Sequence, residues 1–133
     1  MKKFYVMSPG PTEVPSELLL ESAKPTMHHR TPEFSELFYK VSEDLKPIFK
    51  TKNEVYILVS SGTGAMECAV TNLLSKGDKV FVVDGGKFGE RWGNIAKAYG
   101  LNAHIEKVEW GCAIDPQIVK NYLSQNQDRK SVV

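Results

Sequence analysis

The most informative stretch of this 133-residue chain is Val55-Tyr-Ile-Leu-Val-Ser-Ser-Gly-Thr-Gly-Ala-Met-Glu67. Its apolar first half predicts a buried strand over 55–60, and Gly62 and Gly64 predict a turn that opens a helix. Such a junction directs several backbone N–H groups at one point beside a helix N-terminus, where they can bind an anion such as phosphate. The stretch therefore predicts a strand–turn–helix unit with an anion-binding loop.

Strand and helix patterns alternate from residue 54 to the end of the chain. The predicted elements after the first strand are a helix over 65–74 with Gly77 as its C-cap, strands over 79–84 and 104–109, helices over 88–99 and 116–124, and a strand that opens at 131–133. This alternation predicts an α/β fold with a mainly parallel sheet and helices on both faces. A ligand is expected outside the carboxyl ends of the strands.

The first 50 residues are organised differently. Residues 8–15 carry three prolines and form a rigid extended arm, because proline does not fit a helix interior. A short helix is predicted from Ser16, and Thr31-Pro32 predicts the N-cap and first position of a longer one. One face of this longer helix is expected to be buried, because apolar residues recur at helical spacing: Phe34, Leu37, Phe38, Val41, Leu45 and Ile48.

The sequence thus divides into an N-terminal arm with helices, 1–50, and a sheet-containing part, 51–133. A domain rarely stops two residues into a buried strand, so we expect the second part to be incomplete and the chain to be the N-terminal portion of a longer polypeptide.

Composition and charge exclude several classes of function. The chain has 17 basic and 16 acidic residues, mixed along its length, so nothing favours a nucleic acid or a membrane surface as partner. Cys68 and Cys112 lack the spacing of a metal site or a disulfide framework. No apolar run is long enough for a signal peptide or a membrane span. We expect a cytoplasmic protein without a metal.

Two kinds of phosphate ligand compete for the loop at 61–64. A dinucleotide site is favoured by the G-x-G of Gly62 and Gly64 and by Asp84, which stands at a predicted strand end where a ribose-binding acid belongs. Glu67 opposes it, because it occupies the position where a third small residue permits close helix–strand packing. The other interpretation is a single phosphomonoester, held by the hydroxyl and amide groups of the same loop.

A phosphomonoester site needs a second group that holds the rest of the ligand. Phe88 follows the predicted strand over 79–84 and the turn Gly85-Gly86, where its ring can lie over a flat heteroaromatic ligand. Ordinary core packing between strand and helix explains the same position equally well. On the residues alone, both interpretations of Phe88 stay open.

Four motifs appear in order along nearly the whole chain. They are Ser-Pro-Gly-Pro-Thr-Glu-Val-Pro at 8–15, His-His-Arg-Thr-Pro-Glu-Phe at 28–34, Ser-Gly-Thr-Gly-Ala-Met-Glu at 61–67 and Gly-Lys-Phe-Gly-Glu-Arg at 86–91. The set resembles the N-terminal part of a class V aminotransferase, most of all the serine–pyruvate and alanine–glyoxylate branch of the fold-type-I enzymes that use pyridoxal 5′-phosphate (PLP).

This resemblance implies a PLP-dependent homodimer with active sites at the subunit interface. It makes Ser61, Gly62, Thr63 and Gly64 the cradle of the cofactor phosphate. Phe88 becomes the ring that stacks on the pyridine, a position where some relatives have tryptophan. The implied substrate-binding residue is Gly10, near the substrate carboxylate, and residues 28–30 lie near the dimer interface and the active-site mouth. The implied substrates are a small amino acid, such as serine or alanine, and a 2-oxo acid.

The resemblance also implies that the catalytic groups lie beyond this chain. A transaminase needs a Schiff-base lysine, an acid paired with the pyridine nitrogen and an arginine for the substrate carboxylate. In the family all three follow the point where this sequence ends, so no catalytic residue is assigned and the isolated chain is expected to be inactive. Two alternatives stay open: a PLP-dependent lyase or desulfurase of the same family, and a nucleotide-binding α/β module that uses Asp84.

Overall fold

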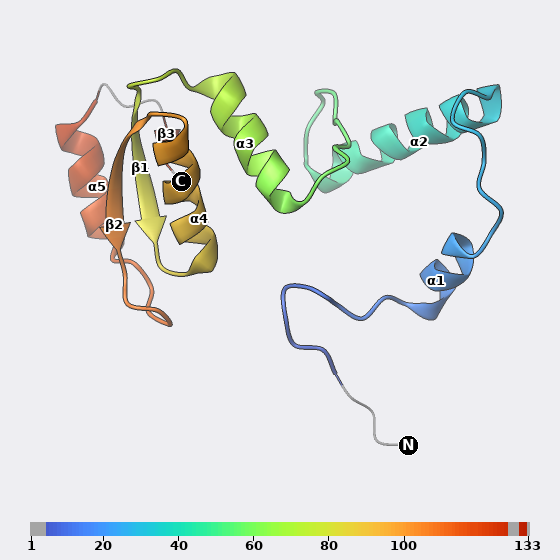
Figure 1. Ribbon diagram of the computed structural model, residues 1–133, viewed down its shortest axis with the longest axis horizontal. Coiled ribbons are helices and arrows are strands. Elements are labelled where there is room, and N and C mark those ends of the chain that lie inside the picture. Colours follow the sequence, from blue (N-terminus) through green and yellow to red (C-terminus); the bar gives the residue numbers. More distant parts are fainter. Residues whose placement is uncertain (1–4, 128–130, 133) are drawn as a thin grey trace. The chain divides into compact units, whose positions relative to one another are not determined.

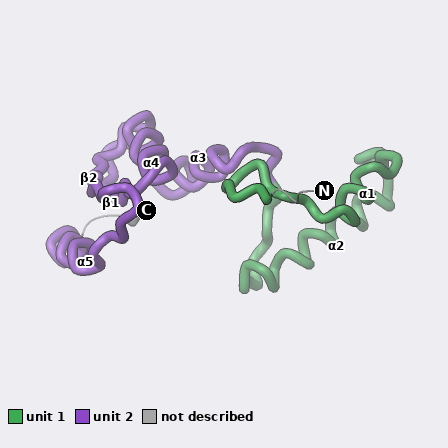
Figure 2. Tube along the Cα trace, turned by 90° about the horizontal axis from the view of Figure 1, so that it is seen from below, with its two compact units in different colours: residues 1–57 green, residues 58–133 purple. Residues whose placement is uncertain are grey.

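The computed structural model describes residues 5–127 and 131–132. They divide into two compact units at the junction of Ile57 and Leu58, drawn in green and purple in Figure 2. Each unit is described by itself below. Within the described residues, no helix is both long and apolar enough to cross a membrane.

The first unit contains two helices, α1 (Ser16–Ser22) and α2 (Pro32–Ile48). The predicted cap of α2 is confirmed, because the Phe34 amide donates to Oγ1 of Thr31 at 3.3 Å and Pro32 is the first helical residue. The predicted buried face is wrong, since α2 has no buried residue within the described structure. A helix buries its apolar stripe only where another layer packs over it.

The segment that joins the two units forms no strand. The strand predicted over 55–60 is therefore wrong, and Tyr56 and Val59 are almost fully exposed. A strand needs a neighbour that accepts and donates along its edge, and no described strand pairs with this segment. The apolar run predicts a preference for extended backbone, but strand pairing depends on residues distant in the sequence.

The second unit is the α/β part of the chain (Figure 1). Its elements in order are α3 (Gly62–Leu73), β1 (Lys79–Asp84), α4 (Lys87–Ala98), β2 (Asn102–Lys107), α5 (Pro116–Gln125) and β3 (Ser131–Val132). The described strands form a sheet of order β2-β1-β3 in which both pairings are parallel. The prediction of a parallel sheet with alternating helices is confirmed, including β3 at residues 131–132. Val133 lies outside the described residues.

Several boundaries in this unit differ from the predictions. Helix α3 begins at Gly62 instead of residue 65, so the two glycines predicted as a turn are among its first residues, and α4 and α5 differ by one residue at their ends. Strand β2 begins and ends two residues earlier than expected, because its register is fixed by pairing of Lys79 with Asn102. Helix α3 ends at Leu73 with Leu74 as its C-cap, so Gly77 does not cap it. Gly77 lies instead in the following turn at φ +88°, a backbone conformation that favours glycine.

The core is built on β1, whose side chains alternate between two covered faces. Val80 and Val82 pack on one face with residues of α3 and α4, namely Val70, Ile95 and Ala96. Phe81 points to the other face, where its ring lies 4.5 Å from that of Tyr122 in α5. All three β1 side chains are at most 1% exposed, so β1 is the central strand with helices on both sides.

Helix α4 packs very closely on the sheet through two glycines. A Cβ atom added to Gly89 would overlap the carbonyl oxygen of Val83 and lie 2.9 Å from Cα of Asp84, both backbone atoms of β1. A Cβ added to Gly93 would lie 2.9 Å from Cδ1 of Ile105, the mobile end of a side chain. The first turn of α4 is therefore fixed against the carboxyl end of β1.

These two glycines give a matched test of that packing. Both gain the same helix propensity when changed to alanine, but only Gly89→Ala forces backbone apart, so we expect it to lower the free energy of unfolding by about 1–3 kcal/mol. Gly93→Ala should lower the free energy of unfolding by less, because Ile105 can change rotamer. Urea unfolding of the two variants checks this, and equal effects would show that α4 does not approach β1 as described.

Candidate functional site

The predicted phosphate loop forms the N-terminus of α3. Ser61 is the N-cap residue with extended backbone, and its hydroxyl makes no hydrogen bond to the helix. Gly62 and Thr63 are the first two helical residues, so their N–H groups have no carbonyl partner inside the helix. Free amide hydrogens, an uncommitted hydroxyl and the positive end of the helix dipole together suit an anion.

Thr63 and Phe88 are brought together by a third residue, Arg91 of α4. Nη1 of Arg91 donates to Oγ1 of Thr63 at 2.9 Å. The guanidinium carbon of Arg91 lies 5.5 Å from the centroid of the Phe88 ring, one helical turn earlier on the same helix. The N-termini of α3 and α4 thus meet through one side chain, near the carboxyl end of β1.

Phe88 of the second unit is 55% exposed as a residue. It does not belong to the buried cluster formed by α3, β1 and α4. Phe88 is thus outside the described core of this unit, and its stacking role stays a prediction. The ring keeps an accessible surface while its neighbour Arg91 lies over it.

The other two glycines of the predicted site differ in their surroundings. A Cβ on Gly64 would overlap the side chain of Ser60, so close packing of the loop on itself already accounts for a glycine there. Gly10 has open space around it and belongs to the first unit. Its role near a substrate carboxylate remains a prediction.

Asp84, the residue on which the dinucleotide interpretation rests, lies at the end of β1. Its Oδ1 is buried without a hydrogen-bond partner among the described residues. The side chain borders a polar hollow of about 290 Å³ whose other lining residues come from α4 and β2: Glu90, Asn94, Lys97, Ile105 and Lys107. Residues 61–64 do not line this hollow, so the structure does not join Asp84 to the phosphate loop through it.

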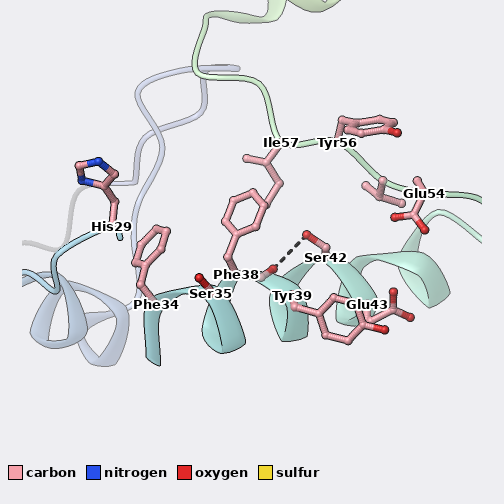
Figure 3. Close-up of a pocket in the computed structure, with 11 residues that line it drawn as sticks. His29, Phe34, Ser35, Phe38, Tyr39, Ser42, Glu43, Glu54, Tyr56 and Ile57 are labelled. Carbon is pink, nitrogen blue, oxygen red and sulfur yellow. Dashed lines mark hydrogen bonds between the residues drawn. The ribbon is translucent and has the colours of Figure 1, made fainter. Parts of the chain in front are cut away.

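The first unit has an apolar hollow of its own, of about 480 Å³ (Figure 3). Phe34 and Phe38 of α2 project into it, and Tyr56 and Ile57 line its other side. His29 reaches its edge and stacks on His28 at 4.7 Å. The hollow carries no group of the predicted phosphate site, and the roles of residues 28–30 remain predictions.

Arg91 was not predicted from the sequence as a functional residue. Arg91 donates a hydrogen bond to a residue 28 positions away in the sequence, and no local sequence pattern predicts a contact over such a separation. The one available signal was its place in the motif at 86–91, three residues after Phe88. That spacing predicts a shared helix face, but not the bond to Thr63.

Comparison with known proteins gives the family. The aminotransferase class-V family model matches residues 5–132. An uncharacterized aminotransferase of Methanocaldococcus jannaschii is 43% identical over 130 residues, covering 98% of this chain and 34% of that protein. The L-aspartate–glyoxylate aminotransferase of Paracoccus denitrificans is 36% identical over 80% of this chain and 27% of its own length.

A solved structure agrees with these relatives. The ureidoglycine–glyoxylate aminotransferase of Bacillus subtilis superposes with a TM-score of 0.82 at 28% identity, over 92% of this chain and 32% of that one. The chain belongs to the class V aminotransferase family and has its α/β fold. It spans about a third of the length of the curated relatives that it matches.

The first turn of α4 gives a prediction about pH. The side-chain hydrogen bond from Lys87, at 2.6 Å, and the charge of Lys87 lower the pKa of Glu90. A depressed pKa in the folded state stabilises the fold above the unfolded-state pKa, and this contribution is lost as pH falls through the folded pKa. Lys87→Met should therefore raise the Glu90 pKa, measured by NMR titration of its carboxyl carbon.

Lys120→Met, which removes a lysine from α5, is the control and should leave the Glu90 titration unchanged. An unchanged Glu90 pKa in Lys87→Met would mean that the pair beside Phe88 is not formed in solution.

Proposed function

We propose that this chain supplies the PLP phosphate site of a class V aminotransferase. The observation that carries the proposal is the cluster of Thr63, Arg91 and Phe88 at the N-terminus of α3. It combines hydrogen-bond donors, a positive charge and an accessible aromatic ring. A phosphate monoester on a flat heteroaromatic ring needs all three, and the donors fit phosphate better than a neutral ligand.

The proposed roles follow from the chemistry of each group. The amide hydrogens of Gly62 and Thr63 and the hydroxyls of Ser61 and Thr63 donate to the phosphate. The Phe88 ring lies against the pyridine and holds its plane. When bound, PLP supplies an electron sink for amino-group chemistry. The residues of this chain bind and orient that group, and the proton-transferring lysine is expected elsewhere in the complete subunit.

The substrates proposed are a small amino acid as donor and a 2-oxo acid as acceptor. Glyoxylate is the acceptor that we favour, because it occurs in the names of both functionally named relatives above, whereas their donors differ. The aminotransferase names of these relatives favour amino transfer over lyase or desulfurase chemistry. Assembly as a cytoplasmic homodimer, with Gly10 near the substrate carboxylate, completes the proposal.

The test compares PLP with pyridoxal, which lacks the phosphate, in the complete subunit that carries this chain. The wild-type protein should bind PLP far more tightly than pyridoxal in equilibrium dialysis. Ser61→Ala should weaken PLP binding roughly tenfold or more while leaving pyridoxal binding unchanged, since one charge-assisted hydrogen bond contributes about 1.5–3 kcal/mol. Ser124→Ala on α5 is the matched control and should change neither. Equal affinities for PLP and pyridoxal would overturn the proposal.

A further inference from the structure

Arg91 is an exposed cation that forms no ion pair with any carboxylate in the part of the chain that the structure describes. Lys87, which lies one turn earlier on the same helix, does form an ion pair, with Glu90. The guanidinium is committed to two uncharged groups instead, the Thr63 hydroxyl and the Phe88 ring. An anionic ligand bound at the N-terminus of α3 would pair with this charge.

The hydrogen bond from Arg91 leaves the hydroxyl hydrogen of Thr63 free to be donated to another group. A hydroxyl group has one hydrogen to donate and two lone pairs, whereas a guanidinium can only donate. In the 2.9 Å contact Oγ1 of Thr63 is therefore the acceptor, and its own hydrogen remains available. The result is a hydroxyl polarised by a cation and held ready to donate at the start of α3.

Other helical hydroxyls in this chain are used differently. Thr71 donates to the carbonyl of Glu67 at 2.9 Å, and Ser42 donates to the carbonyl of Phe38 at 3.0 Å. These hydroxyls donate their hydrogen to a backbone carbonyl of the preceding helical turn. Thr63 has no preceding turn, because α3 begins at Gly62, and its hydroxyl is oriented from outside by Arg91.

We propose that Arg91 is a positioning residue that couples the two halves of the cofactor site. Its Nη1 turns the Thr63 hydroxyl into a phosphate donor, while its guanidinium plane holds one face of the Phe88 ring and leaves the other face for the pyridine. This inference rests on the proposed function and adds to it. Arg91 makes the phosphate cradle and the stacking ring depend on each other.

The test is a double-mutant cycle on PLP affinity in the complete subunit, with pyridoxal as the second probe. Thr63→Val removes the hydroxyl at nearly constant shape, and Arg91→Met removes the guanidinium. Each is expected to weaken PLP binding about tenfold, and the double variant should be no weaker than the worse single variant, because both changes remove the same oriented donor. Losses that multiply to about a hundredfold would overturn the coupling.

Two further variants separate orientation from charge. Arg91→Lys keeps the positive charge but cannot bond to Thr63 and cover Phe88 together, so it should resemble Arg91→Met. Wild-type PLP affinity in Arg91→Lys would overturn the positioning role. Lys97→Met removes a charge from the same helix away from this cluster and should bind PLP as the wild type does.

A spectroscopic readout tests the ring half of the proposal. The circular dichroism band of bound PLP should change in Arg91→Met, since the Phe88 ring loses its support, and should be unaltered in Lys97→Met. An identical band in Arg91→Met would contradict this half. If the wild-type subunit showed no preference for PLP over pyridoxal, the proposed function itself would fail. If the preference is present but the cycle is multiplicative, only the role of Arg91 fails.

Discussion

The close approach of α4 to the carboxyl end of β1 is the constraint on which the second unit depends. Gly89 makes it possible, because any side chain at this position would run into the backbone of Val83 and Asp84. The contact sets where the first turn of α4 begins and therefore where Phe88 and Arg91 project. With β1 buried between helices on both faces, this geometry is held by the core of the unit rather than by a surface loop.

The site follows from this packing in a few physical steps. A strand ends, a short glycine turn reverses the chain, and a helix starts within reach of the N-terminus of a neighbouring helix. Helix starts offer unpaired N–H groups, so two of them close together concentrate donors and positive potential. Arg91 adds a full charge to these partial ones. Membership of the family is the basis on which PLP is proposed as the ligand of this site.

Features set by neighbouring residues were predictable from the sequence. The Thr31-Pro32 start was recognised because the capping residue and the proline are adjacent, and the cap forms as expected. The limits of β1 were also predicted, since a short apolar run between turn residues leaves few alternatives. Features that depend on distant partners were not. The segment at 55–60 has strand-forming residues but no described neighbouring strand, and no layer among the described residues buries the apolar stripe of α2.

The difference between local and distant interactions also explains which parts of the candidate site could be predicted. Its loop and its aromatic ring each have a local signature, and both were named from the sequence. The link between them crosses from α3 to α4, and only the fold brings Arg91 to Thr63.

The central proposal is that the N-terminus of α3 holds the phosphate of PLP. A crystal structure of the complete subunit with PLP tests it most directly. We expect phosphate oxygens within hydrogen-bonding distance of the Thr63 hydroxyl and the first amides of α3, with the Phe88 ring on the pyridine. A phosphate bound elsewhere, with Thr63 and Arg91 still bonded only to each other, would contradict it.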